Sequence, residues 1–69
     1  MTPTELIREI IYKGEITQTK LADLIGVKQA TISRLRHKKN GMSVKTARAL
    51  IRLGAKYNIH VTLEELLMD

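Results

Sequence analysis

The sequence contains no cysteine, no tryptophan and no phenylalanine, and it has only one proline. The lack of cysteine excludes disulfide bridges, thiolate metal sites and a cysteine nucleophile. No apolar run approaches the ~18 residues of a membrane span, and the charged start of the chain lacks the pattern of a secretory signal peptide. We therefore expect a cytoplasmic protein. Its 69 residues suffice for one domain, residues 1–69, with a small core.

Acidic residues are absent from the middle of the chain, although the net charge is only +5. All seven of them lie before Leu24 or after Leu63, and nine basic residues lie between these two positions. The nine are Lys28, Arg34, Arg36, Lys38, Lys39, Lys45, Arg48, Arg52 and Lys56. This distribution indicates a positive surface that faces a polyanion. The alternative is a solvated lysine-rich surface, but such a surface normally carries acids as well.

Apolar residues recur at helical spacing and never alternate as in a strand, so we expect an all-α fold of five short helices. Thr2 and Glu5 form a capping box for the first helix, with proline at its first position, and Gly14 ends it. Thr17 caps the second helix, which a left-handed Gly26 ends. The third helix follows at once.

The second half of the chain contains two further helices. After a loop over residues 37–42, Ser43 caps a longer helix that ends near Asn58. Gly54 interrupts this helix at a cost of about 1 kcal/mol relative to alanine, which favours a close packing contact as the reason for it. Thr62 and Glu65 form a second capping box, which opens the last short helix.

Residues 18–37 have the features that a helix-turn-helix requires. Its first helix needs a small residue where the second crosses it, and Ala22 is there. The turn needs a residue that tolerates positive φ, and Gly26 supplies it. Apolar side chains must converge beneath the crossed helices. They are Leu21, Ile25, Val27, Ile32 and Leu35.

The third helix, expected from Lys28 to His37, has a polar and basic side. Ile32 and Leu35 define its buried side at 100° per residue. The opposite side consists of Ala30, Ser33, Arg34 and His37, and Gln29 flanks it at the N-terminal end; we call these five residues the outer face. A short basic helix face of this kind suits the major groove of DNA, which is about 12 Å wide.

The side chains of the outer face predict specific base contacts. Gln29 has a donor and an acceptor that match adenine, and Arg34 matches guanine or, turned outward, a phosphate. The methyl groups of Ala30 and Thr31 suit a thymine methyl group. Ser33 is able to bond either base type.

This stretch resembles the Cro and repressor type of helix-turn-helix regulators, the XRE-like family. The matching positions are Leu21, Ala22, Ile25, Gly26, Val27, Ile32 and Leu35. The similarity extends over almost the whole chain, including the run Gly-Val-x-Gln-x-Thr-Ile-Ser-Arg and the closing Leu-Glu-Glu-Leu-Leu. It implies a five-helix Cro/repressor-like domain whose second and third helices form the helix-turn-helix. It also implies a base contact for Gln29 and a phosphate contact for Gln18.

The chain departs from this pattern at Lys28, where many relatives have a serine or threonine cap; about 1 kcal/mol of capping is lost and a charge for phosphate is gained. Further phosphate contacts are expected in and around the following loop. With Gln18 and Lys28 these candidates are Lys38, Lys39, Asn40 and Lys45. Arg48, Arg52 and Lys56 recur at spacing four, and a merely solvated face explains them equally well.

The expected function is transcription regulation by a Cro-like repressor, in a bacterial cell or a phage-infected host. A homodimer on a palindromic duplex operator would place two half-sites about 34 Å apart. We expect its contact surface near Ile59, Leu63, Leu66 and Leu67, although these side chains also suit the core. The chain is either a complete small protein or the DNA-binding module of a longer repressor.

Two other functions use the same fold. An antitoxin-type protein would also bind a toxin, and a protein-binding module would have an acidic or apolar third helix. An enzyme is not expected, since the sequence has neither a phosphate-cradling glycine loop nor a nucleophile elbow. His37 and His60 are too far apart, and too poor in carboxylate neighbours, for a metal site. We expect no cofactor and no small-molecule ligand.

Overall fold

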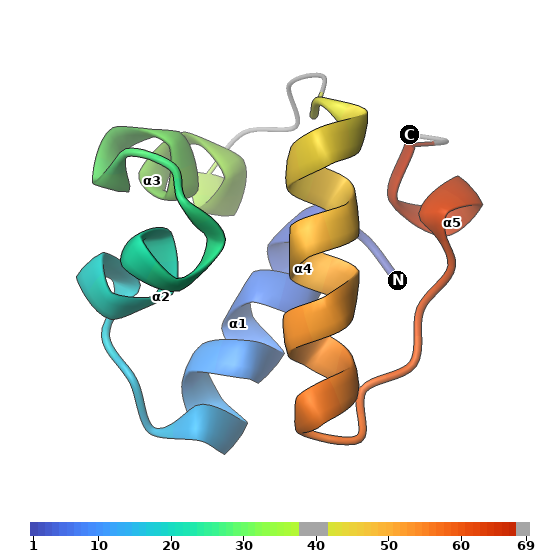
Figure 1. Ribbon diagram of the computed structural model, residues 1–69, viewed down its shortest axis with the longest axis horizontal. Helices are drawn as coiled ribbons and strands as arrows, with labels where there is room; N and C mark the ends of the chain where they lie inside the picture. The colour runs from blue at the N-terminus through green and yellow to red at the C-terminus, as the bar shows by residue number, and fades with distance from the viewer. Residues whose placement is uncertain (38–41, 68–69) are drawn as a thin grey trace.

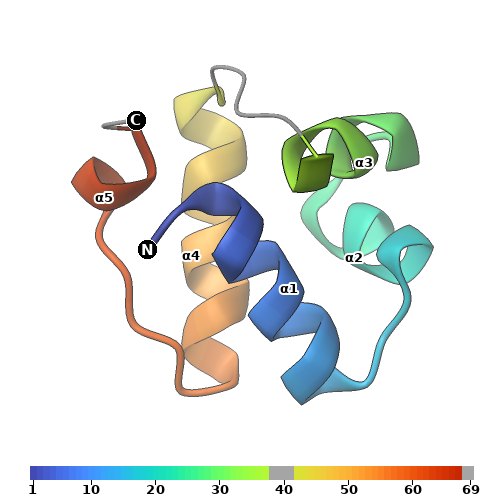
Figure 2. The ribbon, with the colours of Figure 1, turned by 180° about the vertical axis from the view of Figure 1, so that it is seen from behind.

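The computed structural model describes residues 1–37 and 42–67, and this part of the chain is all-helical. Its five helices are α1 (Pro3–Gly14), α2 (Gln18–Ile25), α3 (Gln29–His37), α4 (Val44–Lys56) and α5 (Leu63–Leu67). In Figure 1, α2 and α3 lie on one side of the long helix α4, with α1 behind it and α5 on the opposite side. Figure 2 shows the same order from behind, with α1 in front. The expected all-α, five-helix fold is confirmed.

The helices begin where short-range capping allows. The Thr2 hydroxyl accepts a hydrogen bond from the Glu5 amide at 3.1 Å, and the Glu5 carboxylate accepts one from the Thr2 amide at 2.8 Å. Thr17 and Ser43 cap α2 and α4 through a single bond each: their hydroxyl groups accept hydrogen bonds from the amides of Lys20 and Thr46. These predicted caps are confirmed, because each depends only on residues three positions apart.

Two helix ends differ from expectation in an instructive way. Gly14 is the last residue of α1, but the left-handed residue is Glu15, with φ of 51°. The glycine instead leaves room for the ring of Tyr57, since a Cβ atom at Gly14 would lie 2.9 Å from its Cζ atom and the ring would have to shift. At the end of α4 the cap is Tyr57, and Asn58 has the left-handed conformation one residue later.

The core is formed by one side of every helix and by the segment before α5. Its buried apolar residues are Leu6, Ile7, Ile10, Leu21, Ala22, Ile32, Leu35, Ala47, Leu50, Ile59, Val61 and Leu66. The expected reason for Gly54 is confirmed. A Cβ atom there would lie 3.3 Å from Cδ1 of Leu6 and 3.4 Å from the carbonyl oxygen of Ile59. The glycine therefore lets α1 and the segment after α4 approach the helix closely.

The core corrects the expected dimer surface. Ile59 is 5% exposed and Leu66 is 2% exposed, so both side chains are buried within a single copy. They belong to the same apolar cluster as the buried residues of α1 and α4. Leu63 is partly buried against this cluster, whereas Leu67 is 40% exposed. Of the four predicted residues, only these last two remain available at the surface.

None of the helices in the described part of the chain is long and apolar enough to cross a membrane.

Candidate nucleic-acid interface

The turn between α2 and α3 depends on the backbone of Gly26. This residue has φ of 76°, and no atom lies within 4 Å of the position that a Cβ would take. The conformation rather than the space therefore calls for glycine, as the sequence predicted. The Val27 amide then donates to the Ala22 carbonyl at 3.0 Å, which closes the end of α2. The chain is thereby turned sharply into α3.

The start of α3 has no side-chain cap within the described residues. The amides of Thr31 and Ile32 donate to the Lys28 carbonyl at 3.0 and 3.4 Å, so Lys28 precedes the helix. The helix begins at Gln29, one residue later than expected. The lysine side chain has no oxygen that could cap the free amides at this end of the helix. Its ammonium group is exposed instead.

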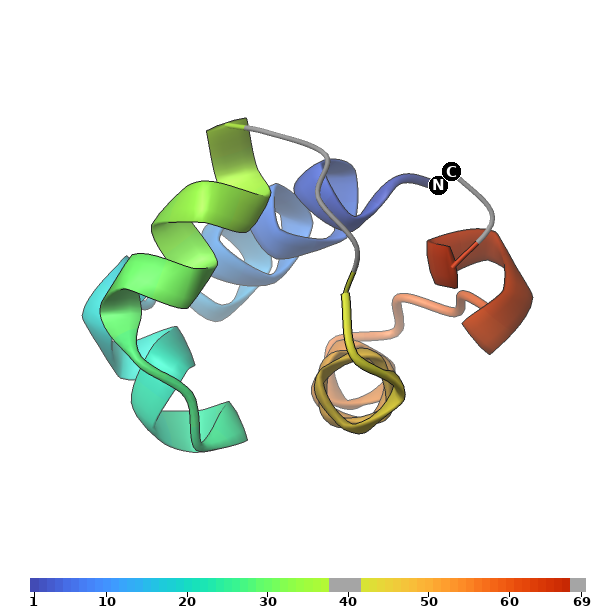
Figure 3. The same cartoon turned by 90° about the horizontal axis from the view of Figure 1, so that it is seen from above.

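The structure leaves the outer face of α3 open to solvent. Ile32 and Leu35 are buried on the opposite side of the helix. Figure 3, viewed from above, shows that no described element covers α3 from this direction, and that α4 is seen end-on with its N-terminal end toward the viewer. Gln29, Ala30, Arg34 and His37 are exposed, and Ser33 is half-buried. A helix surface of this kind protrudes, as entry into a groove requires.

Thr31 lies at the edge of the outer face rather than at its most exposed line. It is half-buried and lines, with Arg34, a shallow groove of about 310 Å³ between α3 and the start of α4. The far wall of this groove includes Ser43 and Thr46, whose hydroxyl groups are 3.0 Å apart and hydrogen-bonded. The sequence spacing alone does not distinguish this edge position from the most exposed line.

The predicted phosphate contacts differ in their positions. Lys28 and Lys45 are exposed, on either side of α3 in the sequence. Lys45 lies in the first turn of α4, whose N-terminal end faces the same way as the open side of α3 (Figure 3). Lys38, Lys39 and Asn40 lie outside the described residues. Of this group, the structure thus places Lys28 directly before α3 and Lys45 in the first turn of α4.

Gln18 makes a contact that the sequence did not reveal. Its side-chain Oε1 accepts a hydrogen bond of 2.8 Å from Nη1 of Arg36, in the last turn of α3. Both side chains are half-buried. Arg36 belongs to the basic stretch, but nothing in its spacing distinguished a residue that pairs with α2 from one that faces solvent.

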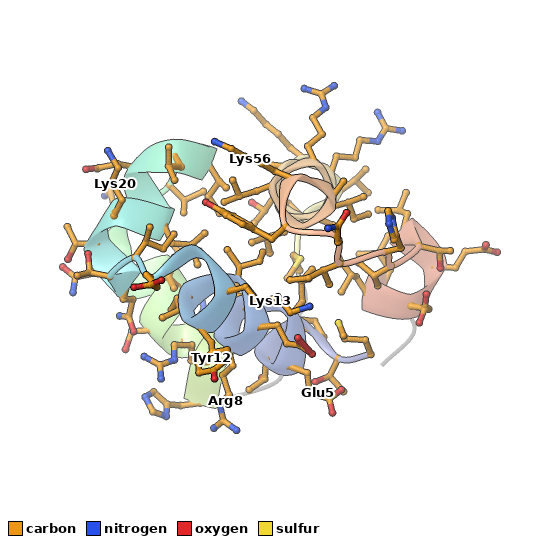
Figure 4. The ribbon with its side chains drawn as sticks, turned by 90° about the horizontal axis from the view of Figure 1, so that it is seen from below. Glu5, Arg8, Tyr12, Lys13, Lys20 and Lys56 are labelled. Atoms are coloured by element: carbon orange, nitrogen blue, oxygen red, sulfur yellow. The ribbon has the colours of Figure 1, made fainter. Side chains whose placement is uncertain are left out.

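The charges near α3 are not neutralised within the described residues. The two ion pairs found there join the Met1 amino group to Glu65 at 3.2 Å and Lys13 to Glu9 at 3.8 Å. Neither involves the basic stretch. Figure 4 shows the opposite face of the molecule, where Lys13, Lys20 and Lys56 are labelled. Lys56 therefore points away from the open side of α3, which favours a solvated role for it.

The described residues offer surface recognition rather than catalysis. They contain no cluster of three or more histidine, cysteine, aspartate or glutamate residues suited to a metal ion. No polar side chain among them is buried in the core. What the site presents is an exposed helix with hydrogen-bonding and cationic side chains, beside the N-terminal turn of a second helix.

Comparison with known proteins agrees with this geometry. A family model described as helix-turn-helix matches residues 7–63, from within α1 to the start of α5. No curated protein and no solved structure gives a significant match. The match spans the α2–turn–α3 unit and the helices that support it. The chain therefore belongs to the XRE-type helix-turn-helix family of DNA-binding transcription regulators.

Proposed function

We propose that this protein is a Cro-like repressor that binds a palindromic operator as a homodimer, with α3 in the major groove. DNA binding and transcription regulation follow from membership of the family. Repression, the palindromic operator and the homodimer are what we propose in addition. The observation that carries it is the open outer face of α3, which lacks any acidic residue. In this proposal the operator-bound dimer acts by excluding other proteins from the same DNA.

Base contacts are assigned to the outer face by side-chain chemistry. Gln29 donates to and accepts from adenine, and Arg34 donates two hydrogen bonds to guanine. Ala30 packs on a thymine methyl group, and Ser33 bonds to an adjacent base. Thr31 reaches a base only from the flank of the helix, where it lines the groove toward α4.

Phosphate contacts are assigned around this face. Lys28 precedes α3, and Lys45 lies in the first turn of α4. The start of α2 adds Gln18 and the positive end of a helix dipole. The remaining candidates of this group are Lys38, Lys39 and Asn40. Such contacts fix the position of the protein on DNA and make binding salt-dependent, whereas the base contacts select the sequence.

The dimensions of the domain support a dimer joined through the α5 side. Two half-sites one helical turn apart place the two α3 helices about 34 Å apart, so each lies about 17 Å from the dimer axis. The longest extent of the domain is 27 Å, with α3 toward one end of it and α5 at the other (Figure 1). The exposed side chain of Leu67 and the half-buried Leu63 supply apolar contact there.

Selection of binding sites from random duplexes tests this proposal. We expect enrichment of an inverted repeat whose half-sites are about 10 base pairs apart. On the selected site, the logarithm of the affinity should fall with the logarithm of salt concentration by about 0.9 per phosphate contacted. Enrichment of a single asymmetric site would contradict the dimer, and no retention on any duplex at low salt would contradict DNA recognition.

The two protein-binding alternatives make the opposite prediction. A module that binds only protein would show no salt-dependent retention on duplex DNA. An acidic or apolar outer face on α3 would have favoured it, but this face carries Gln29 and Arg34. An antitoxin-type protein would bind DNA and a toxin, and the described residues present nothing that favours the second partner over the first.

A further inference from the structure

The hydrogen bond between Arg36 and Gln18 joins the end of α3 to the start of α2, the two helices of the helix-turn-helix. Nη1 of Arg36, in the last turn of α3, lies 2.8 Å from Oε1 of Gln18, the first residue of α2. We infer that Arg36 is a positioning residue that orients the Gln18 amide so that its NH₂ group faces a DNA phosphate. This inference rests on the proposed function, because it assigns a partner to one of its phosphate contacts.

The orientation of the amide follows from the chemistry of the two groups. A guanidinium group only donates hydrogen bonds, so the atom of Gln18 that faces it must be the acceptor oxygen. The amide nitrogen is then on the other side of the group, with two N–H donors left for another acceptor. A phosphate oxygen accepts such bonds and never donates them. Without Arg36, nothing among the described residues would favour this orientation over the flipped one.

Arg36 has few other polar partners among the described residues. Its Nε atom is buried and has no hydrogen-bond partner among the described residues. The guanidinium also forms no ion pair with a described acid. Among the side chains that the structure describes, the one it bonds is Gln18.

The location of the contact suits an anion. Gln18 and Thr19 are the first two residues of α2, where helix geometry leaves the backbone amides without intrahelical acceptors. The Thr17 hydroxyl satisfies only the amide of Lys20, at 3.0 Å. A phosphate at this end would therefore meet the two backbone amides, the NH₂ group of Gln18 and the positive charge of Arg36 together.

A double-mutant cycle on the selected operator tests the inference. The variants are Gln18→Ala, Arg36→Met and the combination, with Lys56→Met as a control that removes one exposed cation from the face opposite the open side of α3 (Figure 4). We expect each single variant of the pair to lower operator affinity by about tenfold. Arg36→Met should cost clearly less affinity in the Gln18→Ala background than in the unaltered protein, because only the charge of Arg36 is then lost. The free energy of unfolding of each variant is measured alongside.

A second variant separates orientation from folding. Gln18→Glu keeps an acceptor for Arg36 but has no NH₂ group. It should retain or raise the thermal midpoint and yet lower operator affinity by more than tenfold. Thr19→Glu places the same charge one residue away and controls for repulsion; it should weaken binding less than Gln18→Glu does.

The outcomes separate this inference from the proposed function. If the two single losses simply add, or if Arg36→Met raises affinity because it releases Gln18, Arg36 does not position the amide, while the proposed function stands. If Arg36→Met changes only the unfolding curve, the contact is structural and the inference is wrong. If the unaltered protein selects no operator, the proposed function and the inference fall together.

Discussion

The hydroxyl group of Thr4, in α1, donates a hydrogen bond of 2.7 Å to the main-chain carbonyl of Leu35, in the last turns of α3. The last four carbonyl groups of a helix have no intrahelical donor, so this contact satisfies one of them. It also ties the recognition helix to the helix that supports it. The position of the outer face therefore depends on α1 as well as on the turn at Gly26.

Replacement of Thr4 by valine tests this tie. Valine has the shape of threonine but no hydroxyl group, so the carbonyl of Leu35 loses its partner in a partly buried place. We expect the free energy of unfolding to fall by about 1 kcal/mol, measured by urea denaturation. Thr19→Val, at an exposed position in α2, is the matched control and should change it by less than about 0.5 kcal/mol. Equal effects would show that the hydrogen bond contributes nothing.

The two left-handed residues at the ends of α1 and α2 predict opposite mutational effects. Glu15, with φ of 51°, is in a conformation that costs a residue with a Cβ atom about 1–2 kcal/mol. We expect Glu15→Gly to stabilise the protein by about 1 kcal/mol after the extra unfolded-state freedom of glycine is counted. Gly26→Ala should destabilise it by a similar amount, although no atom obstructs the added methyl group. Thermal and urea denaturation measure both changes.

The helices and their starts could be predicted because their signals are local. Thr2, Thr17 and Ser43 each cap an amide three residues away, so the sequence contains the whole interaction. The same holds for the buried side of α3, which follows from the spacing of Ile32 and Leu35 alone.

The remaining features depend on contacts between distant segments, and no periodicity reveals them. Gly14 matters because Tyr57, from the end of α4, packs against it. Ile59 is buried because the chain folds back along α4, where its amide donates to the Gly54 carbonyl at 2.9 Å. The partner of Gln18 likewise lies 18 residues away. An apolar residue near a chain end is equally consistent with a core and with a dimer surface until such contacts are known.

The two capping boxes predict a loss of stability in acid. Hydrogen bonds from the Thr2 amide and hydroxyl lower the pKa of Glu5 below its ordinary 4.5, and the Thr62 amide and the terminal amino group lower that of Glu65. Because the folded pKa is depressed, the stabilisation is present above pH 4.5 and is lost as the pH falls through the lowered values. The temperature of the thermal midpoint should therefore decrease as the pH is lowered below 4.5.

Glutamine substitutions identify the groups responsible. The double variant Glu5→Gln, Glu65→Gln should lose less of its thermal midpoint between pH 6 and pH 3 than the unaltered protein does, measured by circular dichroism at about 0.5-unit steps. Glu64→Gln, which changes an exposed acid next to the second box, is the control. If all three proteins follow the same pH curve, the capping carboxylates do not cause the acid sensitivity.

The exposed end of α5 predicts which substitution separates assembly from folding. Leu67→Glu places a charge on a side chain that is 40% exposed, so the fold should tolerate it while a dimer joined there should weaken. Sedimentation with operator DNA should then show one copy per duplex at concentrations where the unaltered protein binds as two. Ile59→Ala should instead lower the free energy of unfolding by about 2–5 kcal/mol, because it empties part of the core. Unchanged stoichiometry for Leu67→Glu would place the dimer contact elsewhere.

Gln29 and Lys45 should affect DNA recognition in different ways, because one faces bases and the other faces the backbone in the proposed complex. Gln29→Ala should relax the preference at a single position of each half-site by about 1–3 kcal/mol and leave the salt dependence nearly unchanged. Lys45→Ala should weaken binding to every sequence alike and reduce the salt slope by about 0.9, since one fewer phosphate is neutralised. Repeating the site selection and the salt titration with both variants measures the two effects independently. A preferred site that is unchanged in Gln29→Ala would mean that another side of α3 faces the bases.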